Sequence, residues 1–140
     1  MENLNKNMKI ECFEDASSEQ EIKEMIEKSK ITIPKDYIEI IQNKSEIEIR
    51  VSGKKIIRIW GAVGCIEMNE AYNIQKYLPN TWAIGDDEGG NAIIYSNGKH
   101  GFGIYAVSFN DLEEDEKTFI APSLYDFFVN GIGVNNFIEL

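Results

Sequence analysis

The spacing of apolar residues changes its period at Glu46, and this change most constrains what the chain can fold into. From Ser18 to Lys28 the apolar residues recur every three or four positions, as on one face of a helix. From Ile47 to Val51 they alternate with charged residues, as in a half-buried strand. Helical patterns followed by a run of strand patterns indicate an α+β fold, because an α/β fold would interleave the two.

Two helix starts are marked in the first part of the chain. Ser18 and Glu21 form a capping box, in which each side chain accepts a hydrogen bond from a free backbone N–H of the first turn. Pro34 can open a second helix, because the N–H that it lacks has no partner at that position. Residues 37–41 then supply an apolar stripe for this second helix.

The second part of the chain predicts several short strands and two more helices. The pattern predicts a helix from Met68 to Tyr77, capped by Asn69, and a closing helix from Ser123 to Asn130. Asn97-Gly98 is the strongest hairpin-turn signal, because both central residues of such a turn need positive φ. The further strands are expected at residues 57–60, 82–84, 91–95, 102–107 and 119–121.

The charge balance argues against nucleic acid as a ligand. Lys and Arg number 14 and Asp and Glu number 24, which gives a net charge of −10. A strongly negative chain repels phosphate backbones unless its basic residues cluster, and the densest basic group is only Arg50, Lys54, Lys55 and Arg58. An acidic surface suits solubility and basic protein partners.

Length and composition predict one cytoplasmic domain over residues 1–140, with its core at about 18–129. The first ten residues lack an apolar segment typical of a signal peptide, and no stretch is long enough to span a membrane. Cys12 and Cys65 are too few for a disulfide framework, and their apolar neighbours predict buried, reduced thiols. The pattern does not define an oligomeric state.

No catalytic or metal-binding constellation is evident, so the sequence predicts neither an enzyme nor a cofactor. His100 is the one histidine, which leaves general acid–base and nucleophilic sets incomplete. One histidine and two cysteines are also too few for a zinc site. The stretch from Asp86 to Gly90 lacks the spacing of a calcium loop, and its acids would repel a phosphate.

Two acidic groups remain, and each has two interpretations. They are either solvated loops or a docking face that steers a cationic partner. Trp60 and Trp82 are either core residues or apolar anchors of such a face. The acidic residues concerned are Asp86, Asp87, Glu88, Asp111, Glu113, Glu114, Asp115 and Glu116.

Four segments, in order along the chain, resemble motifs of the SUKH superfamily, the Smi/Knr-like group. Ile33 to Tyr37 resembles its LP-x-x-Y helix start, and Ile57 to Trp60 resembles its Trp-bearing strand. Ala83 to Gly90 resembles its IG-x-D-G-G strand and turn, with one additional acid before the glycines. Ile120 to Phe128 resembles its closing helix. The chain lacks the Asn-Gly-Gly-like stretch that often follows the first motif.

The resemblance implies a strongly curved, mostly antiparallel sheet with flanking helices and a role without catalysis. Bacterial members of the group are mostly immunity proteins, which bind and block a cognate toxin, often a nuclease. The expected partner is therefore a basic toxin, held stoichiometrically, without nucleic acid, membrane, metal or cofactor. The alternatives are an adaptor with an endogenous partner and, less favoured, a small-molecule-binding domain. The expected contact residues are Trp60, Asp86, Asp87, Glu88, Glu113, Glu114, Asp115 and Glu116.

Overall fold

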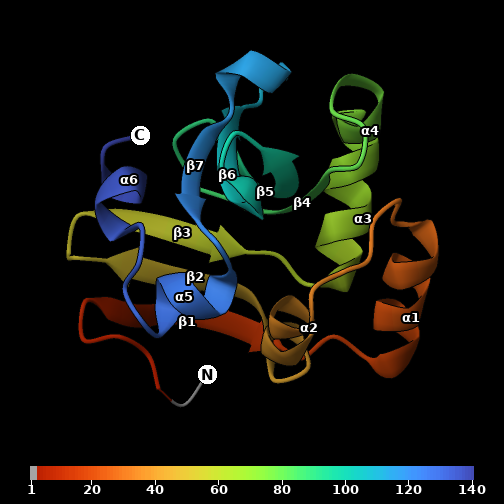
Figure 1. Ribbon diagram of the computed structural model, residues 1–140. Coiled ribbons are helices and arrows are strands. Elements are labelled where there is room, and N and C mark those ends of the chain that lie inside the picture. Colours follow the sequence, from red (N-terminus) through yellow and green to blue (C-terminus); the bar gives the residue numbers. More distant parts are fainter. Residues whose placement is uncertain (1–2) are drawn as a thin grey trace.

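Seven strands form one antiparallel sheet, in chain order, in the computed structural model, which describes residues 3–140 (Figure 1). Each strand pairs with the next one along the chain, which confirms the α+β prediction. Met1 and Glu2, part of the expected domain, lie outside the described residues. The strands are β1 (Met8–Asp15), β2 (Lys44–Val51), β3 (Lys55–Ile59), β4 (Trp82–Asp86), β5 (Asn91–Gly98), β6 (Gly101–Ser108) and β7 (Thr118–Ala121).

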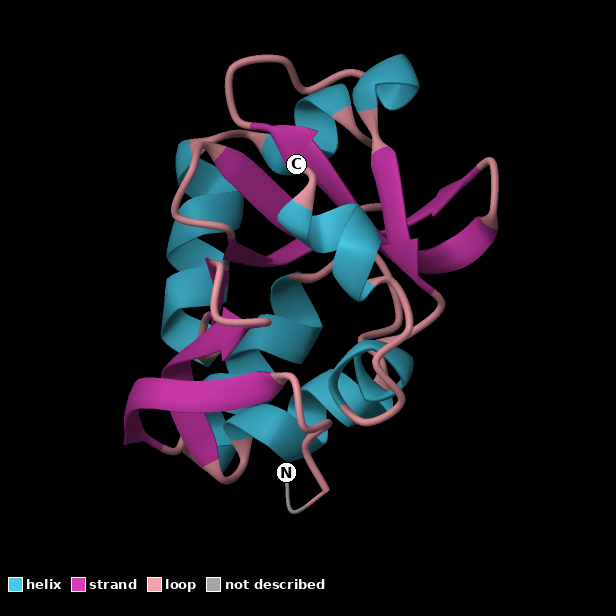
Figure 2. Cartoon of the chain, turned by 90° about the vertical axis from the view of Figure 1, so that its left-hand side faces the viewer, coloured by secondary structure: helices cyan, strands magenta, loops and turns pink. Residues whose placement is uncertain are grey.

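The sheet bends sharply between β3 and β4. These two strands share only the pairs Arg58–Asp86 and Ile59–Gly85, whereas β1 and β2 pair along most of their length. Figure 2 shows the strands in two groups with helices packed between them. The helices are α1 (Glu19–Lys28), α2 (Lys35–Ile41), α3 (Ala62–Ala71), α4 (Ile74–Tyr77), α5 (Leu124–Phe128) and α6 (Val134–Ile138), with a 3-10 turn, η1 (Glu114–Glu116).

The helix starts fall where the capping residues predict them. At α1, Glu21 N donates to Ser18 Oγ at 3.1 Å and Ser18 N donates to Glu21 Oε1 at 2.7 Å, so the capping box is complete. Pro34 directly precedes α2. Ser123 caps α5 by accepting from Asp126 N at 3.0 Å. None of the helices within residues 3–140 is long and apolar enough to cross a bilayer.

The prediction for the helix after β3 is wrong in its start and its cap. The helix α3 begins at Ala62 and runs through Gly64, and Asn69 lies inside it with its side chain buried. The residue before this helix is Gly61, and a Cβ added there would lie 2.7 Å from Ser45 Cβ. Close packing against Ser45 therefore requires glycine at this position.

The predicted Asn97-Gly98 turn is also wrong. Both residues are strand residues of β5, and the hairpin turns two positions later, at Lys99 and His100. A Cβ on Gly98 would lie 2.7 Å from the ring of Tyr105, so the side chain packed against this position requires glycine. The positive φ of this hairpin falls at Gly101 instead.

The two cysteines differ in their surroundings. Cys65 is buried, as predicted, but Cys12 is exposed on β1 and the prediction is wrong for it. The thiol of Cys12 donates to Glu48 Oε2 at 2.6 Å across the β1–β2 pair, so a charged neighbour replaces the expected apolar one.

Two buried side chains tie the helices to the sheet. The hydroxyl of Tyr37 in α2 donates to the carbonyl oxygen of Trp60 at 2.6 Å and lies 2.7 Å from Cys65 Sγ. In α3, Asn69 donates to the carbonyl oxygen of Ala83 and accepts from Ala83 N. The side-chain amide of Asn69 thus makes the same pair of hydrogen bonds to Ala83 in β4 that the backbone of a neighbouring strand would make.

We expect Tyr37→Phe to lower the free energy of unfolding by about 1–3 kcal/mol, because a buried carbonyl loses its hydrogen-bond donor. Urea unfolding measures this loss. Tyr125→Phe is the control, since Tyr125 is 58% exposed and its change should stay within about 0.5 kcal/mol. Equal effects of the two substitutions would show that the hydrogen bond to Trp60 contributes nothing.

Candidate functional site: an acidic cleft

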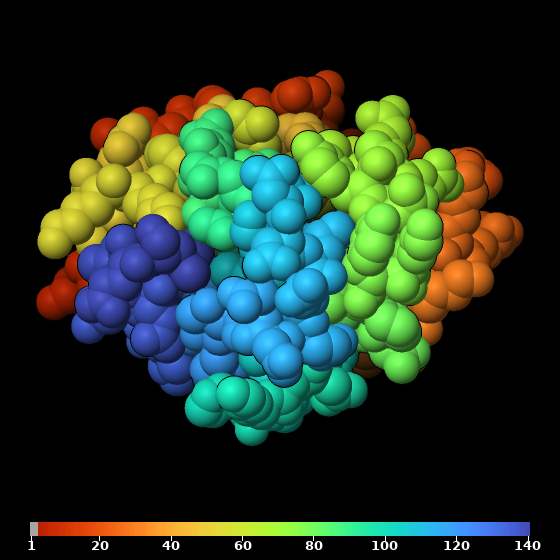
Figure 3. All heavy atoms as spheres, turned by 90° about the horizontal axis from the view of Figure 1, so that it is seen from above, coloured from red at the N-terminus to blue at the C-terminus, as the bar shows by residue number. Residues whose placement is uncertain are grey.

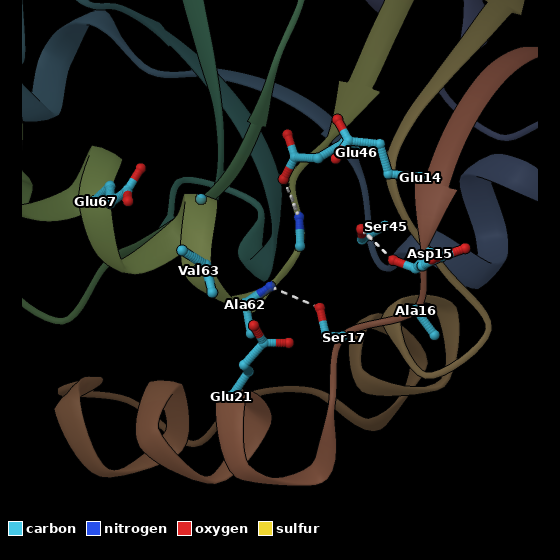
Figure 4. Close-up of a pocket in the computed structure, with 12 residues that line it drawn as sticks. Glu14, Asp15, Ala16, Ser17, Glu21, Ser45, Glu46, Ala62, Val63 and Glu67 are labelled. Atoms are coloured by element: carbon cyan, nitrogen blue, oxygen red, sulfur yellow. Dashed lines mark hydrogen bonds between the residues drawn. The ribbon is translucent and has the colours of Figure 1, made fainter.

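A cleft of about 810 Å³ opens where β1 ends and where α1, β2 and α3 begin (Figure 4). The ends of four elements meet here, and most of their acidic side chains are exposed around a common space, while Ala62 and Ser45 form its buried floor. The lining residues are Glu14, Asp15, Ala16, Ser17, Glu21, Ser45, Glu46, Gly61, Ala62, Val63, Gly64 and Glu67.

The charge of the cleft is of one sign only. Its lining holds five carboxylates and neither lysine nor arginine. None of the five takes part in an ion pair within the described part of the chain. They therefore repel one another, and a cation that entered the cleft would relieve this repulsion. The five residues are Glu14, Asp15, Glu21, Glu46 and Glu67.

The start of α3 fixes one wall of the cleft. Gly61 N donates to Glu46 Oε2 at 2.6 Å, and Ala62 N donates to Ser17 Oγ at 3.0 Å. Both donors belong to the N-terminal end of α3, where a carboxylate is favoured by the helix dipole. Val63, the next residue, is 46% exposed and adds an apolar surface to the cleft.

Glu46 occupies an unusual backbone position. Its φ is 45°, in the left-handed region that non-glycine residues seldom adopt. The β1–β2 register shifts beside it, between the pairs Cys12–Glu48 and Glu14–Ser45. This irregularity turns the Glu46 side chain toward α3, where it meets Gly61.

The pKa of the Glu46 carboxyl is raised above its ordinary value. Burial is the main cause, because it disfavours the charged form, and the nearby charges of Glu14 and Asp86 act in the same direction. The hydrogen bond from Gly61 N and the charge of Arg58 oppose the shift without cancelling it.

The structure buries two of the expected contact residues. Trp60 is only 3% exposed, and its Nε1 donates to Asp86 Oδ2 at 2.8 Å. Asp87 is likewise 3% exposed and holds the turn between β4 and β5 together, accepting from Gly89 N and Asn91 N. In this structure neither side chain is available to a partner.

The remaining expected residues near this turn are at the surface but already have partners. Glu88 Oε1 accepts from Arg58 Nη2 at 2.6 Å, and Glu48 lies 3.4 Å from the same guanidinium. Asp86 accepts from Trp60 and from Glu88 N. One arginine is thus shared among several acids, which leaves this area negative.

The acidic loop, residues 110–117, is exposed, as its sequence indicates. Glu113, Glu114, Asp115 and Glu116 all face solvent, and among the described residues only Glu114 of these four has an ion pair, with Lys117. Lys117 anchors the loop to the sheet by donating to Ser96 Oγ at 3.0 Å and to Asn97 O at 2.6 Å.

Sequence reasoning missed the cleft residues because the cleft is assembled from five separate segments. Glu14 and Asp15 end an unpredicted strand, and Glu67 lies on a helix whose start is placed too late. Glu21 had a sufficient explanation as half of a capping box. Glu46 stands where the spacing of apolar residues changes. This spacing does not indicate the direction of its carboxylate, so the sequence did not predict that Glu46 lines a cleft.

Fold and site together describe an α+β protein that presents an acidic, open surface built over a bent antiparallel sheet. Residues 16–130 match the SMI1 / KNR4 family (SUKH-1), and the chain belongs to this family. The matched range contains all four motifs on which the resemblance rests, and it excludes α6. No curated protein matches the sequence.

We expect Glu46→Gln to stabilise the chain at neutral pH, since the buried charge is costly there. A raised carboxyl pKa means that the folded state holds a proton longer than the unfolded state as pH rises, so stability falls through that range. The advantage of the variant should therefore shrink between about pH 7 and about pH 4.5. Urea unfolding at the two pH values measures it.

The control for this prediction is Glu67→Gln, which removes one charge from the exposed rim of the same cleft. If both variants gain equally at neutral pH, general repulsion rather than the burial of Glu46 sets the effect.

Asp87→Asn should lower the free energy of unfolding by about 3 kcal/mol, because Lys55, only 18% exposed, would lose its carboxylate at 3.0 Å. Burial tends to raise the pKa of Asp87, but hydrogen bonds from Asn91, Lys55 and Gly89 lower it below its usual value. Its stabilising contribution is therefore full at neutral pH and is lost as pH falls through the lowered pKa.

Urea unfolding from about pH 7 downward tests this prediction. Glu88→Gln, at the next position, is the matched control and should change stability by no more than about 1 kcal/mol, since its ion pair is exposed. An unchanged midpoint for Asp87→Asn would contradict a structural role.

Proposed function

We propose that this chain is an immunity protein that neutralises a basic toxin by binding it stoichiometrically in the cytoplasm. Membership of the SUKH family supports this function. The observation that carries the proposal is the acidic cleft, whose five carboxylates have no ion-pair partner within residues 3–140.

The electrostatics favour a basic partner over other ligands. The net charge is −10, and the lining residues of the cleft include neither lysine nor arginine that a basic partner would have to displace. A nuclease must carry a basic surface to hold its substrate, so an acidic protein competes for the same surface. Complementary charge also raises the association rate, which matters for a protein that must capture a toxin early.

We propose a contact surface made of two acidic areas, the cleft and the acids of the β4–β5 turn and the 110–117 loop. From the expected set it retains Asp86, Glu88, Glu113, Glu114, Asp115 and Glu116. Trp60 and Asp87 are left out because both are buried. Val63 replaces Trp60 as the apolar contact, since it lines the cleft and is 46% exposed.

The proposed action is occlusion. The chain would cover the substrate-binding surface of the toxin. This requires a complex that dissociates slowly, and it involves no chemical reaction. The family assignment agrees with this mode, since the resemblance implies binding without catalysis.

Co-expression with the product of a neighbouring toxin-like reading frame tests the function, with recovery of growth as the readout. The wild-type chain should restore growth and form a one-to-one complex. Failure to bind or to restore growth would contradict the proposal, and capture of an endogenous protein instead would favour an adaptor.

Charge reversal tests the contact surface. A cleft variant with Glu14, Asp15, Glu21 and Glu67 changed to Lys should associate at least about tenfold more slowly and lose much of its salt dependence. A loop variant with residues 113–116 reversed should also slow association. Stopped-flow mixing at several ionic strengths measures both.

The matched control reverses Glu19, Glu27, Glu39 and Glu139, which are exposed and outside the cleft. It changes the net charge by the same amount as the cleft variant. If the control slows association as much as the cleft variant does, net charge rather than the proposed contact surface governs binding.

A further inference from the structure

Three aromatic rings from different segments form a row beside the acidic loop. The ring centroids of Tyr72 and Phe109 are 4.4 Å apart, and those of Phe109 and Trp60 are 6.5 Å apart and stacked. Exposure increases along the row, from buried Trp60 through half-buried Phe109 to Tyr72, which is 40% exposed. The row therefore ends in an aromatic surface that solvent reaches.

Backbone bonds hold this surface in place. Tyr72 caps the C-terminal end of α3, and its N–H donates to Met68 O at 3.1 Å. Phe109 N donates to Gly90 O at 3.0 Å, which fixes the residue to the β4–β5 turn. In Figure 3 the loop after β6, in light blue, lies directly against the green surface of α3 and α4. The two rings thus come from rigid neighbours rather than from mobile ends.

Carboxylates follow the aromatic pair along the loop. Asp111 lies two residues after Phe109, and carboxylate oxygens of Asp111, Glu113 and Glu116 lie within 4.8 Å of one another. All three residues are exposed, and none has an ion pair within residues 3–140. An aromatic face whose Phe109 leads along the chain into several exposed carboxylates suits a planar cation.

We propose that the Tyr72–Phe109 pair and the acidic loop receive an arginine side chain of the protein partner. A guanidinium stacks flat on an aromatic ring and still presents N–H donors at its edge to carboxylates, whereas an ammonium is a compact, strongly hydrated charge. This site would select arginine over lysine. That the partner is a toxin rests on the proposed function.

Short blocked peptides test the chemistry directly. The probes are glycine-spaced peptides carrying two arginines, two lysines or two citrullines. They are titrated against the chain, with ring-proton shifts of Tyr72 and Phe109 and the fluorescence of the two tryptophans as readouts. The arginine peptide should bind at least about threefold more tightly than the lysine peptide, and the neutral citrulline peptide should not bind. Equal affinities for arginine and lysine would overturn the inference.

Variants locate the site. Tyr72→Leu keeps an apolar side chain but removes the ring, so it should abolish the preference for arginine. Asp111→Asn combined with Glu113→Gln and Glu116→Gln should weaken both cationic peptides. Tyr77→Leu is the control, because Tyr77 is 51% exposed and lies on α4 under Lys76. An equal loss in Tyr77→Leu, or none in Tyr72→Leu, would contradict the assignment.

Growth rescue separates this inference from the proposed function. If wild-type chain neutralises the toxin but shows no preference for arginine, the inference fails and the function stands. If the preference depends on Tyr72 but no toxin is neutralised, the function fails and the arginine site stands for another partner. The exposed position of Tyr72 means that its variant should unfold at the wild-type urea concentration, and a lower midpoint would assign the effect to folding.

Discussion

The hydrogen bond from the Tyr37 hydroxyl to the carbonyl oxygen of Trp60 is the constraint on which the rest of this structure depends. Trp60 stands where the chain leaves β3 and enters α3, so the bond fixes α2 against both elements at once. The adjacent Asp36 extends the same connection, because its carboxylate accepts from the hydroxyl of Tyr95 and from Tyr125 N. The start of one short helix therefore organises the sheet, α3 and α5. In this chain the tyrosine of the segment that resembles the LP-x-x-Y motif is thus buried and connects α2 to the start of α3.

The same junction creates the cleft. Once Trp60 is fixed, Gly61 must begin α3 within reach of β2, and its N–H is taken by Glu46. The half-buried carboxylate is then held by the helix end instead of by a cation, so the cleft keeps its negative charge. A lysine or arginine in the lining would stabilise the free chain better, because it would remove the repulsion among the acids. The free chain is thus less stable than it would be with a basic residue in the cleft, and a bound cationic group could supply that positive charge.

Much of the architecture could be predicted because it is encoded locally. The period of apolar residues predicted the order of most elements between α1 and α5, but neither β1 nor α6. Ser18 with Glu21 and Ser123 marked two helix starts through bonds made within one turn. The failures are tertiary. β1 is an edge strand with most of its side chains exposed, so it lacks an alternating pattern, and Gly98 is required by the ring of Tyr105 rather than by a turn. For Trp60 the sequence left a core position and a surface position both open, and Asp87 was expected at a contact face. Both are buried, and each satisfies its polar atoms internally.

Position decides what each group of acids can contribute. The acids of the 110–117 loop are exposed, and their interaction with a distant cation is long-ranged but weak, so they can act mainly on the rate of encounter. Glu46 lies half-buried at the wall of the cleft, where a charge interacts more strongly because less water screens it. Its partial burial, which raises the pKa of this carboxyl, means that the free chain already bears the cost of partial desolvation. The Glu46 carboxylate has already lost part of its hydration in the free chain. The desolvation penalty for binding a cation there is therefore smaller than at a fully exposed carboxylate. Under the proposed function, the exposed loop is therefore suited to capture and the cleft to retention, because capture alone would give a short-lived complex.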